Sequence, residues 1–428
     1  SILGIYGQNG SGKTALIEVM QLLKYCLTGK IIPESYTKMI HVNSDHASFE
    51  FKFYAEDGKD MYQIVYSFDL YKQLSTNEDN DTSVPLSPRY ISSVENEKLK
   101  YCILNTTAKK NRITIFSNNN HTNETTIIHQ ILKTFQCESN IVDILYAKRK
   151  AKETGRSFLF SNDLLGFIMN QKSRETIILQ LLIQFSNENL FIIKNEESGI
   201  INLHGGMPFN FYISRPESKN YGKVLLPFDK AAYVPAEFVE VAEQAVKSLN
   251  IVLPNLVPGL TIKIERLNEN LDQSGNKVIN VILTSVKNKK SIPLEYESEG
   301  IKKIISVLNL LIACFNKPEI VVAIDEIDSG IYEYLLGEIL QVMSEGAKGQ
   351  LIFTSHNLRP LELLNPKDIL FTTTNPQNRY IRMKHLKKTN NLRNTYYREI
   401  QLDGQDEKLY DSTYNSDIDY AFRKAVRL

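Results

Sequence analysis

The sequence predicts an α/β fold that combines a parallel β core, an antiparallel β subdomain and a mainly helical insertion. The first observation is the stretch GQNGSGKT at residues 7–14, which lies between a short apolar run and a segment rich in helix-forming residues. The second is a later apolar run that ends in Asp325 and Glu326. The third is a change from alternating apolar residues to helical spacing at about residue 127.

The composition predicts a cytoplasmic globular protein without a membrane span. The chain has 428 residues and a net charge of +1, so any nucleic-acid contact has to come from a local patch. Its four cysteines are scattered without a C-x-x-C pair, which argues against a zinc site and for a reducing compartment. No apolar run reaches the roughly 18 residues of a membrane helix. The chain starts at Ser1 directly in the first predicted strand, so we expect earlier strands upstream.

Residues 7–14 match the pattern G-x-x-x-x-G-K-[ST] at the strand-to-helix turn that this pattern requires. Glycines allow successive backbone N–H groups to face one anion, and the following helix adds the positive end of its dipole. The stretch therefore predicts a nucleoside triphosphate site, in which Lys13 reaches the β- and γ-phosphates and the Thr14 hydroxyl binds Mg²⁺. The predicted nucleotide-binding residues are Gly7, Gln8, Asn9, Gly10, Ser11, Gly12, Lys13 and Thr14.

The segment up to residue 119 predicts antiparallel strands, with a hairpin around residues 56–59. From residue 127 to 211 the spacing is mostly helical. This part carries five basic residues between Lys148 and Arg156, which form either a solvated helix face or a contact with nucleic acid or a partner. Two strands are then predicted to pair across a turn at residues 273–276.

Residues 319–324 form a β-prone apolar run, as expected of a buried parallel strand whose C-terminal end opens into a ligand crevice. Asp325, which follows, is predicted to hold Mg²⁺ directly or through water. Glu326 is placed to orient or deprotonate the attacking water. The alternative is an ordinary strand that ends in two solvated acids.

Two further elements flank this strand. Ser298 and Gly300 lie at the start of a helix with apolar residues at 3.6 spacing, which is a second ready-made anion site or, alternatively, a plain Ser N-cap. The next apolar strand, at residues 350–354, leads to His356. On its own His356 would be interpreted as a polar loop residue, but in this order of elements it is predicted to touch the γ-phosphate.

The order of these motifs resembles the ABC-type ATPase head of RecF, SMC and OLD proteins. It is most similar to the AAA/ABC-type ATPases of bacterial anti-phage and abortive-infection systems, including Septu-like and PARIS-like systems. The segments that carry the resemblance are IYGQNGSGKTALIEVM, EYESEGIKK, IDEIDSG, QLIFTSH and, more weakly, NNLRNTYYREIQLDGQ. It implies a P-loop NTPase fold of ABC-ATPase-head type with an N-terminal lobe at residues 1–119, a mainly helical insertion at 120–229 and a C-terminal lobe with a polar tail at 230–428.

The resemblance further implies that two heads dimerise head-to-tail around two ATP molecules with Mg²⁺. Ser298 and Gly300 would then contact the nucleotide bound by the other copy, whereas Glu326 and His356 would act on the nucleotide bound by their own copy. Lys13, Glu326 and His356 are the implied catalytic residues. The sequence departs from the family pattern at Tyr332, where many relatives have Asp or His.

The favoured function is an ATP-driven sensor or scaffold that forms a homodimer or higher oligomer and controls an effector, a nuclease or toxin, in anti-phage defence. The alternative is a DNA-binding ATPase of RecF/SMC type for repair or chromosome maintenance, although the sequence has no long heptad run. Basic clusters at residues 287–290 and 384–393 either contact phosphates or are solvated loops.

A self-contained nuclease is the third hypothesis. The acids that could serve it lie in a polar tail segment, where a solvated cluster is the favoured interpretation. They are Asp403, Asp406, Glu407 and Asp411.

Overall fold

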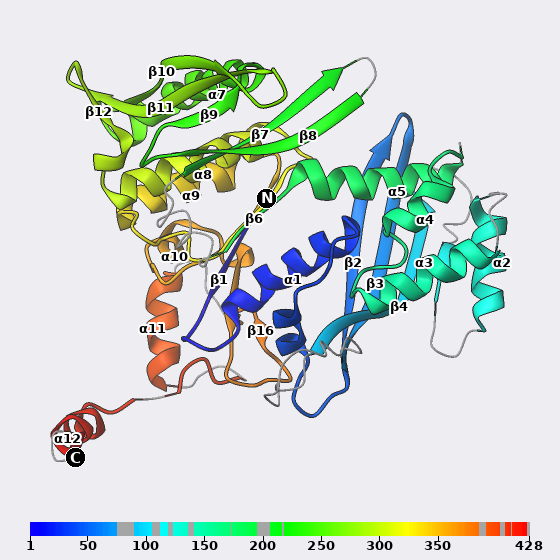
Figure 1. Cartoon of the computed structure of the whole chain (residues 1–428). Coiled ribbons are helices and arrows are strands. Elements are labelled where there is room, and N and C mark those ends of the chain that lie inside the picture. Colours follow the sequence, from blue (N-terminus) through cyan, green and yellow to red (C-terminus); the bar gives the residue numbers. More distant parts are fainter. Residues whose placement is uncertain are drawn as a thin grey trace, which may run out of the picture. The chain divides into compact units, whose positions relative to one another are not determined.

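The computed structural model of the chain describes residues 1–74, 90–104, 112–118, 123–135, 141–171, 173–194, 206–215, 218–384, 391–402, 407–411 and 413–425. It confirms the predicted α/β fold class, with one largely parallel sheet and further antiparallel sheets (Figure 1). The chain divides into two compact units, of which unit 1 comprises Ser1–Glu18 and Leu190–Leu428 and unit 2 comprises Val19–Asn189. Each unit has its own buried hydrophobic cluster.

Unit 1 is built on a six-stranded sheet in the order β16-β15-β1-β14-β13-β6. All strands are parallel except β16, which pairs antiparallel with β15. The strands are β1 (Ile2–Tyr6), β6 (Leu190–Ile193), β13 (Val321–Ile324), β14 (Gln350–Thr354), β15 (Ile369–Thr372) and β16 (Tyr380–Ile381). Every residue of β13 is buried, which agrees with the continuous apolar run that predicted a buried parallel strand.

The other strands of unit 1 are antiparallel, and β10 and β11 pair across the predicted turn at residues 273–276. These strands are β7 (Gly206–Arg215), β8 (Ser218–Pro227), β9 (Ala232–Pro235), β10 (Thr261–Leu271), β11 (Lys277–Lys287) and β12 (Lys290–Pro293). The helices are α7 (Ala236–Leu256), α8 (Glu299–Asn316), α9 (Glu333–Gly346), α10 (Pro360–Leu363), α11 (Leu392–Leu402) and α12 (Asn415–Ala425). Helix α1 (Lys13–Leu27) begins in unit 1 and ends in unit 2.

Unit 2 contains a four-stranded antiparallel sheet in the order β2-β3-β4-β5, and the predicted turn at residues 56–59 lies in the β2–β3 hairpin. The strands are β2 (His46–Asp57), β3 (Asp60–Leu74), β4 (Tyr90–Ile103) and β5 (Ile113–Ser117). The helices are α2 (Glu124–Phe135), α3 (Ile141–Glu153), α4 (Asn162–Ile168) and α5 (Arg174–Gln184), with a short π-helical segment at Phe185–Asn189.

Among the described residues, the helical pattern predicted for residues 127–211 is correct through the π-helical segment that ends at Asn189, and wrong at residues 190–193 and 206–211. Residues 195–205 lie outside the described residues. Residues 190–193 form β6, which extends the parallel sheet beside β13, and β7 follows as one strand of a hairpin. The run LFII is short and β-prone, and pairing with a neighbouring strand decides its conformation. The compact units divide the chain after residues 18 and 189, and the three-part domain division at residues 119 and 229 stays a prediction.

A carboxylate lies within the core of unit 2. Glu97 on β4 is fully buried and accepts hydrogen bonds from the hydroxyls of Tyr66 (2.7 Å) and Ser157 (2.5 Å). It also accepts from the backbone N–H groups of Phe158 (2.9 Å) and Leu159 (3.3 Å). Burial raises the pKa of Glu97, although these four donors act in the opposite direction. The carboxylate therefore joins the sheet to the segment between α3 and α4.

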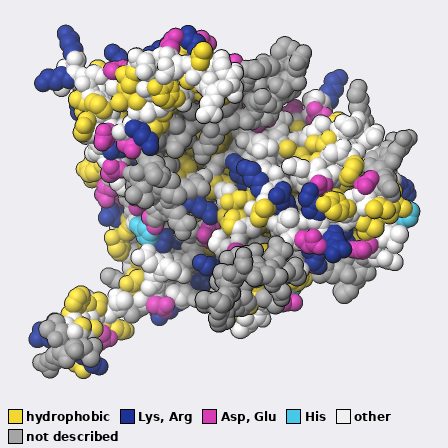
Figure 2. All heavy atoms as spheres, viewed as in Figure 1, with side chains coloured by type: hydrophobic (Ala, Val, Ile, Leu, Met, Phe, Trp, Pro, Cys, Tyr) yellow, Lys and Arg dark blue, Asp and Glu magenta, His cyan; other side chains and the backbone are white. Residues whose placement is uncertain are grey.

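The surface and the thiols fit the composition. Acidic and basic side chains both occur over the face drawn in Figure 2, in keeping with a net charge of +1. The three cysteines among the described residues, Cys26, Cys102 and Cys314, are buried and unpaired. None of the described helices has both the length and the apolar character that crossing a bilayer requires.

Candidate nucleotide-binding site

Residues 7–12 form the turn between β1 and α1 at the C-terminal edge of the parallel sheet, and Lys13 and Thr14 begin α1. Gly7 has a φ of +154°, and a Cβ atom there would collide with the hydroxyl of Thr372 at the end of β15. The Ser11 hydroxyl donates to the carbonyl oxygen of Gln8 (2.6 Å) and is hydrogen-bonded to the same Thr372 hydroxyl. The loop is therefore tied to its own sheet by short contacts that only glycine permits at position 7.

Lys13 points back into this loop. Its Nζ atom donates to the carbonyl oxygens of Gly7 (2.9 Å) and Gln8 (3.0 Å), and the residue is 7% exposed. Burial lowers the pKa of Lys13, and the charges of Asp325 and Glu326 act in the opposite direction. The ammonium is thus held inside the curl of the loop, where phosphate oxygens are its natural partners.

Asp325 follows β13 directly and is 2% exposed. Its Oδ1 atom accepts from the hydroxyl of Thr14 (3.3 Å) and from the hydroxyl of Thr354 (2.5 Å). Because β14 lies between β1 and β13, Thr354 at the end of β14 fills the space between the loop and the carboxylate. A carboxylate beside two hydroxyls is an oxygen donor set that fits Mg²⁺.

The site supplies few protein ligands for such an ion. Within the described parts of the chain no three His, Cys, Asp or Glu side chains gather into a metal-binding group. Mg²⁺ is usually bound by one or two carboxylates together with water and substrate phosphates. Thr14 and Asp325 are therefore the residues that would hold it.

Glu326 has an unusual backbone conformation. Its φ is 47°, in the left-handed region that few residues other than glycine adopt. Its N–H group donates to the Thr354 hydroxyl (2.7 Å), which therefore contacts both members of the Asp-Glu pair. Backbone conformations of this kind cluster at functional sites, where the surrounding structure holds them.

The acidic turn, which we define as residues 325–328 with Asp325, Glu326 and Asp328, is joined to the segment after β14. One carboxylate oxygen of Asp328, Oδ2, accepts from the backbone N–H groups of His356 and Asn357, each at 3.1 Å. The N–H group of Ile327 donates to the carbonyl oxygen of Thr354 (3.1 Å). The structure thus brings the loop, the acidic turn and His356 to the C-terminal ends of three neighbouring strands, with the His356 side chain exposed.

Ser298 and Gly300 have structural contacts within the same copy. The Ser298 hydroxyl accepts from the N–H group of Ile301 (3.4 Å) and caps α8, as the N-cap interpretation expects. A Cβ atom on Gly300 would collide with the carbonyl oxygen of Gly330, so the first turn of α8 lies directly against the turn that follows Asp328. The contact of Ser298 and Gly300 with a nucleotide of another copy stays a prediction.

Two side chains that the sequence did not single out hold the far side of the loop. Arg379 donates to the carbonyl oxygen of Ser11 (3.3 Å), and the Tyr380 hydroxyl donates to that of Gly12 (2.7 Å). No sequence pattern marks these positions, because the connection between β15 and β16 has no diagnostic spacing. Thr354 could have been suspected, since it is a hydroxyl residue at the end of a predicted strand.

A cavity of about 370 Å³ adjoins the loop on the side of His356. It is lined by Tyr6, Gly7, Gln8, Asn9, Ser355, His356, Leu358, Tyr396, Ile400 and Tyr410. The C-terminal region closes one side, because the N–H group of Asp411 donates to the side-chain oxygen of Gln8 (2.8 Å). A segment more than 390 residues away in sequence thus contacts the phosphate loop.

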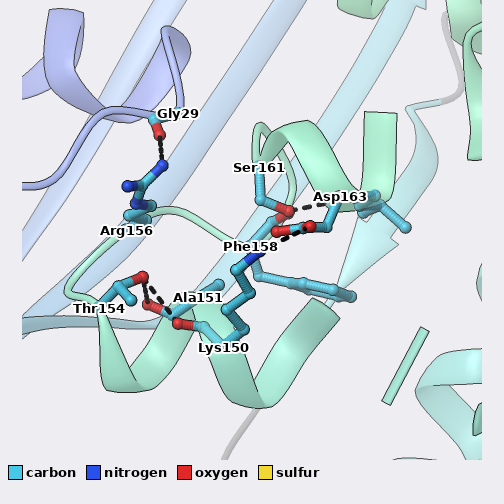
Figure 3. Close-up of polar contacts among 9 residues, drawn as sticks. Gly29, Lys150, Ala151, Thr154, Arg156, Phe158, Ser161 and Asp163 are labelled. Carbon is cyan, nitrogen blue, oxygen red and sulfur yellow. Dashed lines mark hydrogen bonds and ion pairs between the residues drawn. The ribbon is translucent and has the colours of Figure 1, made fainter. Parts of the chain in front are cut away.

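The basic residues between Lys148 and Arg156 have partners within unit 2, and Figure 3 shows two of these pairs, Lys150 with Asp163 and Arg156 with Gly29. Their acidic partners are Glu124 for Lys148, Glu153 for Arg149, Asp163 for Lys150 and Glu95 for Lys152. Arg156 donates to the carbonyl oxygen of Gly29 (3.4 Å). These partners favour the solvated helix face over a phosphate-binding face.

The remaining charged clusters are only partly described. Residues 287–290 form the tight turn between β11 and β12. Residues 385–390 of the second basic cluster, together with Asp403 and Asp406 of the acidic tail, lie outside the described residues. Glu407 accepts from the side-chain amides of Asn375 (2.9 Å) and Asn378 (2.8 Å), which gives this tail acid a structural contact.

Comparison with known protein families gives a match over the middle of the chain. The sequence profile described as "AAA domain, putative AbiEii toxin, Type IV TA system" matches residues 134–362, more than half of the chain. This span contains Ser298, the acidic turn and His356 and begins after the phosphate loop. No curated protein matches the chain.

Three solved structures of Smc heads are similar to the chain. The SmcHead bound to the C-winged helix domain of ScpA has 13% identity and a TM-score of 0.31, over 83% of this chain and 82% of that one. The Pyrococcus furiosus Smc head with an extended coiled coil, bound to the C-terminal domain of ScpA, has 12% identity and a TM-score of 0.31, over 86% of each. The Pyrococcus yayanosii Smc head with a coiled coil and joint has 12% identity and a TM-score of 0.36, over 90% and 92%.

Proposed function

The chain belongs to the family described as "AAA domain, putative AbiEii toxin, Type IV TA system", and on this premise we propose that it binds ATP with Mg²⁺ and hydrolyses it to ADP and phosphate. One observation carries the proposal. The Thr14 hydroxyl at the start of α1 donates to Asp325 at the end of β13 (3.3 Å). Thr14 directly follows the buried Lys13. A phosphate loop and an acidic strand end are thus joined at one edge of a parallel sheet, where α/β proteins bind their ligands.

The side chains divide the chemistry among them. Lys13 and the N–H groups of the loop bind the β- and γ-phosphates. Glu326 orients the attacking water and accepts its proton, and His356 contacts the γ-phosphate. Mg²⁺ held by Thr14 and Asp325 would offset phosphate charge.

A second copy of the chain completes the site in this proposal. Ser298 and Gly300 of that copy would face the γ-phosphate, and their place at the N-terminus of α8 supports this because a helix N-terminus attracts anions. The Glu299 carboxylate pairs with Lys302 of the same helix (3.1 Å), which reduces its repulsion of a phosphate. ATP would therefore close the dimer and hydrolysis would reopen it.

We further propose that this cycle controls an effector, a nuclease or toxin, in bacterial anti-phage defence. The family description names a putative toxin of a type IV toxin–antitoxin system, which supports the part of this proposal that involves a toxin. A DNA-binding ATPase of RecF/SMC type is the alternative. The acid partners of Lys148, Arg149, Lys150 and Lys152 weigh against it, since a phosphate backbone would compete with these neighbouring carboxylates.

Two substitutions test the ATPase. Lys13→Ala should weaken ATP binding about 100-fold or more, because the loop loses its one cation. Glu326→Gln should bind ATP like wild type and hydrolyse it about 10²- to 10³-fold more slowly, because the amide cannot accept the proton. Equilibrium binding and phosphate release measure the two effects. Glu333→Gln, an exposed carboxylate at the start of α9, is the matched control with wild-type turnover.

The same Glu326→Gln protein tests the wider proposal, because it should accumulate as an ATP-bound dimer. Purified from its native host, it should retain a stoichiometric nuclease or toxin-like protein, which mass spectrometry identifies. Bound DNA without a protein partner would favour the RecF/SMC-type alternative. Wild-type turnover by Glu326→Gln would remove Glu326 from the mechanism.

A further inference from the structure

Lys303 is a buried cation that the proposed chemistry does not use. It lies on the second turn of α8, is 5% exposed, and its Nζ atom has no hydrogen-bond partner among the described residues. A buried ammonium without a partner is costly, since desolvation disfavours the charged form. Burial lowers the pKa of Lys303 for this reason, and the charges of Glu326, Asp325 and Asp328 act in the opposite direction.

The acidic turn contains a matching unsatisfied group. Asp328 uses Oδ2 to accept from the N–H groups of His356 and Asn357, whereas its Oδ1 atom is buried and has no hydrogen-bond partner among the described residues. A buried cation and a buried acceptor that act on each other electrostatically, both without hydrogen bonds, form an incomplete pair. These two groups lie on α8 and on the acidic turn, so a hydrogen bond between them would connect the two elements.

The backbone brings these two elements into contact one turn earlier. Gly300 lies so close to Gly330 that no side chain fits between them. Since residues three apart lie on neighbouring parts of a helix surface, Lys303 follows Gly300 along the side of α8 that meets the turn. A shift of α8 therefore moves Lys303 relative to Asp328.

We propose that Lys303 is a positioning residue that connects the Ser298 end of α8 to His356 through the carboxylate of Asp328. The coupling runs from the α8 N-terminus to the Lys303 ammonium, through its charge interaction with the Asp328 carboxylate, and on to the backbone N–H of His356. This inference rests on the proposed function, in which Ser298 contacts the nucleotide of another copy and His356 contacts its own. Lys303 then couples the two nucleotide sites of a dimer within each copy.

The test replaces the ammonium by an apolar chain of similar length. Lys303→Met should reduce kcat about tenfold, because the Asp328 carboxylate that accepts from the His356 N–H loses its nearby cation, and should change KM less than about twofold. It should also leave the urea midpoint of the nucleotide-free protein unchanged or raised, because a buried unpaired charge has been removed. A merely structural lysine would lower that midpoint. Lys317→Met, at the exposed C-cap of the same helix, is the matched control with wild-type kcat.

A double-mutant cycle approaches the same contact from the acidic side. Asp328→Asn should also lower kcat about tenfold, and adding Lys303→Met to it should cause little further loss, because both remove the same charge interaction. Additive losses, or wild-type kcat in Lys303→Met, would overturn the inference while the ATPase proposal stands. A wild-type chain that does not hydrolyse ATP would overturn the proposed function and this inference with it.

Discussion

Asp325 in unit 1 and Glu97 in unit 2 are both buried carboxylates, and they differ in the groups that surround them. Glu97 accepts from two hydroxyls and two backbone N–H groups, all of them neutral. Asp325 accepts from two hydroxyls and acts electrostatically on two buried lysines, Lys13 and Lys303. Burial is common to the two carboxylates, so it does not distinguish a functional site from a structural one. We use the charge of the neighbouring groups to distinguish the two kinds of site.

The two carboxylates differ in whether the groups around them are fully paired within the protein. The donors around Glu97 come from its own unit, and the carboxylate completes them, which is typical of a polar network that fixes a core. The groups around Asp325 are two hydroxyls, one of them at the phosphate loop, and two lysines whose positive charges can attract an anionic ligand. We therefore expect changes at Asp325 to affect activity and changes at Glu97 to affect the free energy of unfolding.

The largest expected effect is on turnover. Asp325→Asn should reduce kcat for ATP hydrolysis about 10²- to 10³-fold, because the neutral amide is a far weaker Mg²⁺ ligand. Glu97→Gln should leave kcat within about twofold of wild type. Steady-state phosphate release measures both, and the comparison breaks if the two variants lose activity to a similar degree.

The next effect reverses the order of the two residues. Glu97→Ala should lower the free energy of unfolding by about 3 kcal/mol, because it leaves buried hydroxyl and N–H donors without an acceptor. Glu97→Gln should cost less, since its oxygen still accepts from Phe158 and Leu159 and the hydroxyls can turn to accept from its amide. Asp325→Asn should change stability least. Urea unfolding followed by circular dichroism ranks the three, and a different order would contradict the assignment.

The smallest effect is a pH dependence. The pKa of Glu97 is raised in the folded protein, so the native state binds its proton more tightly than the unfolded state does. The stabilisation from this group is complete below the ordinary carboxylate pKa and is lost as the pH rises through the raised folded value. The urea midpoint of wild type should therefore fall between pH 5 and pH 8 by more than that of Glu97→Gln. Equal slopes would mean that Glu97 does not titrate in this way.

Much of the site could be predicted from the sequence because its parts are local patterns. Residues 7–14 and the run before Asp325 carry their structure within a few residues, and each forms the predicted element. The features that the sequence did not predict depend on pairing between distant segments. The order of strands that places Thr354 between loop and carboxylate, and the sheet position of β6, follow from long-range contacts that no short window contains. The burial of Lys303 depends on the same kind of long-range packing, and no local pattern marks it.

The contact between Asp411 and Gln8 has a practical consequence. It places Tyr410 in the cavity beside the phosphate loop, and the chain contains no tryptophan. An indole introduced as Tyr410→Trp would be the sole tryptophan fluorophore of the protein and would lie next to the loop. The C-terminal segment thus offers an optical probe of nucleotide arrival that needs no attached dye.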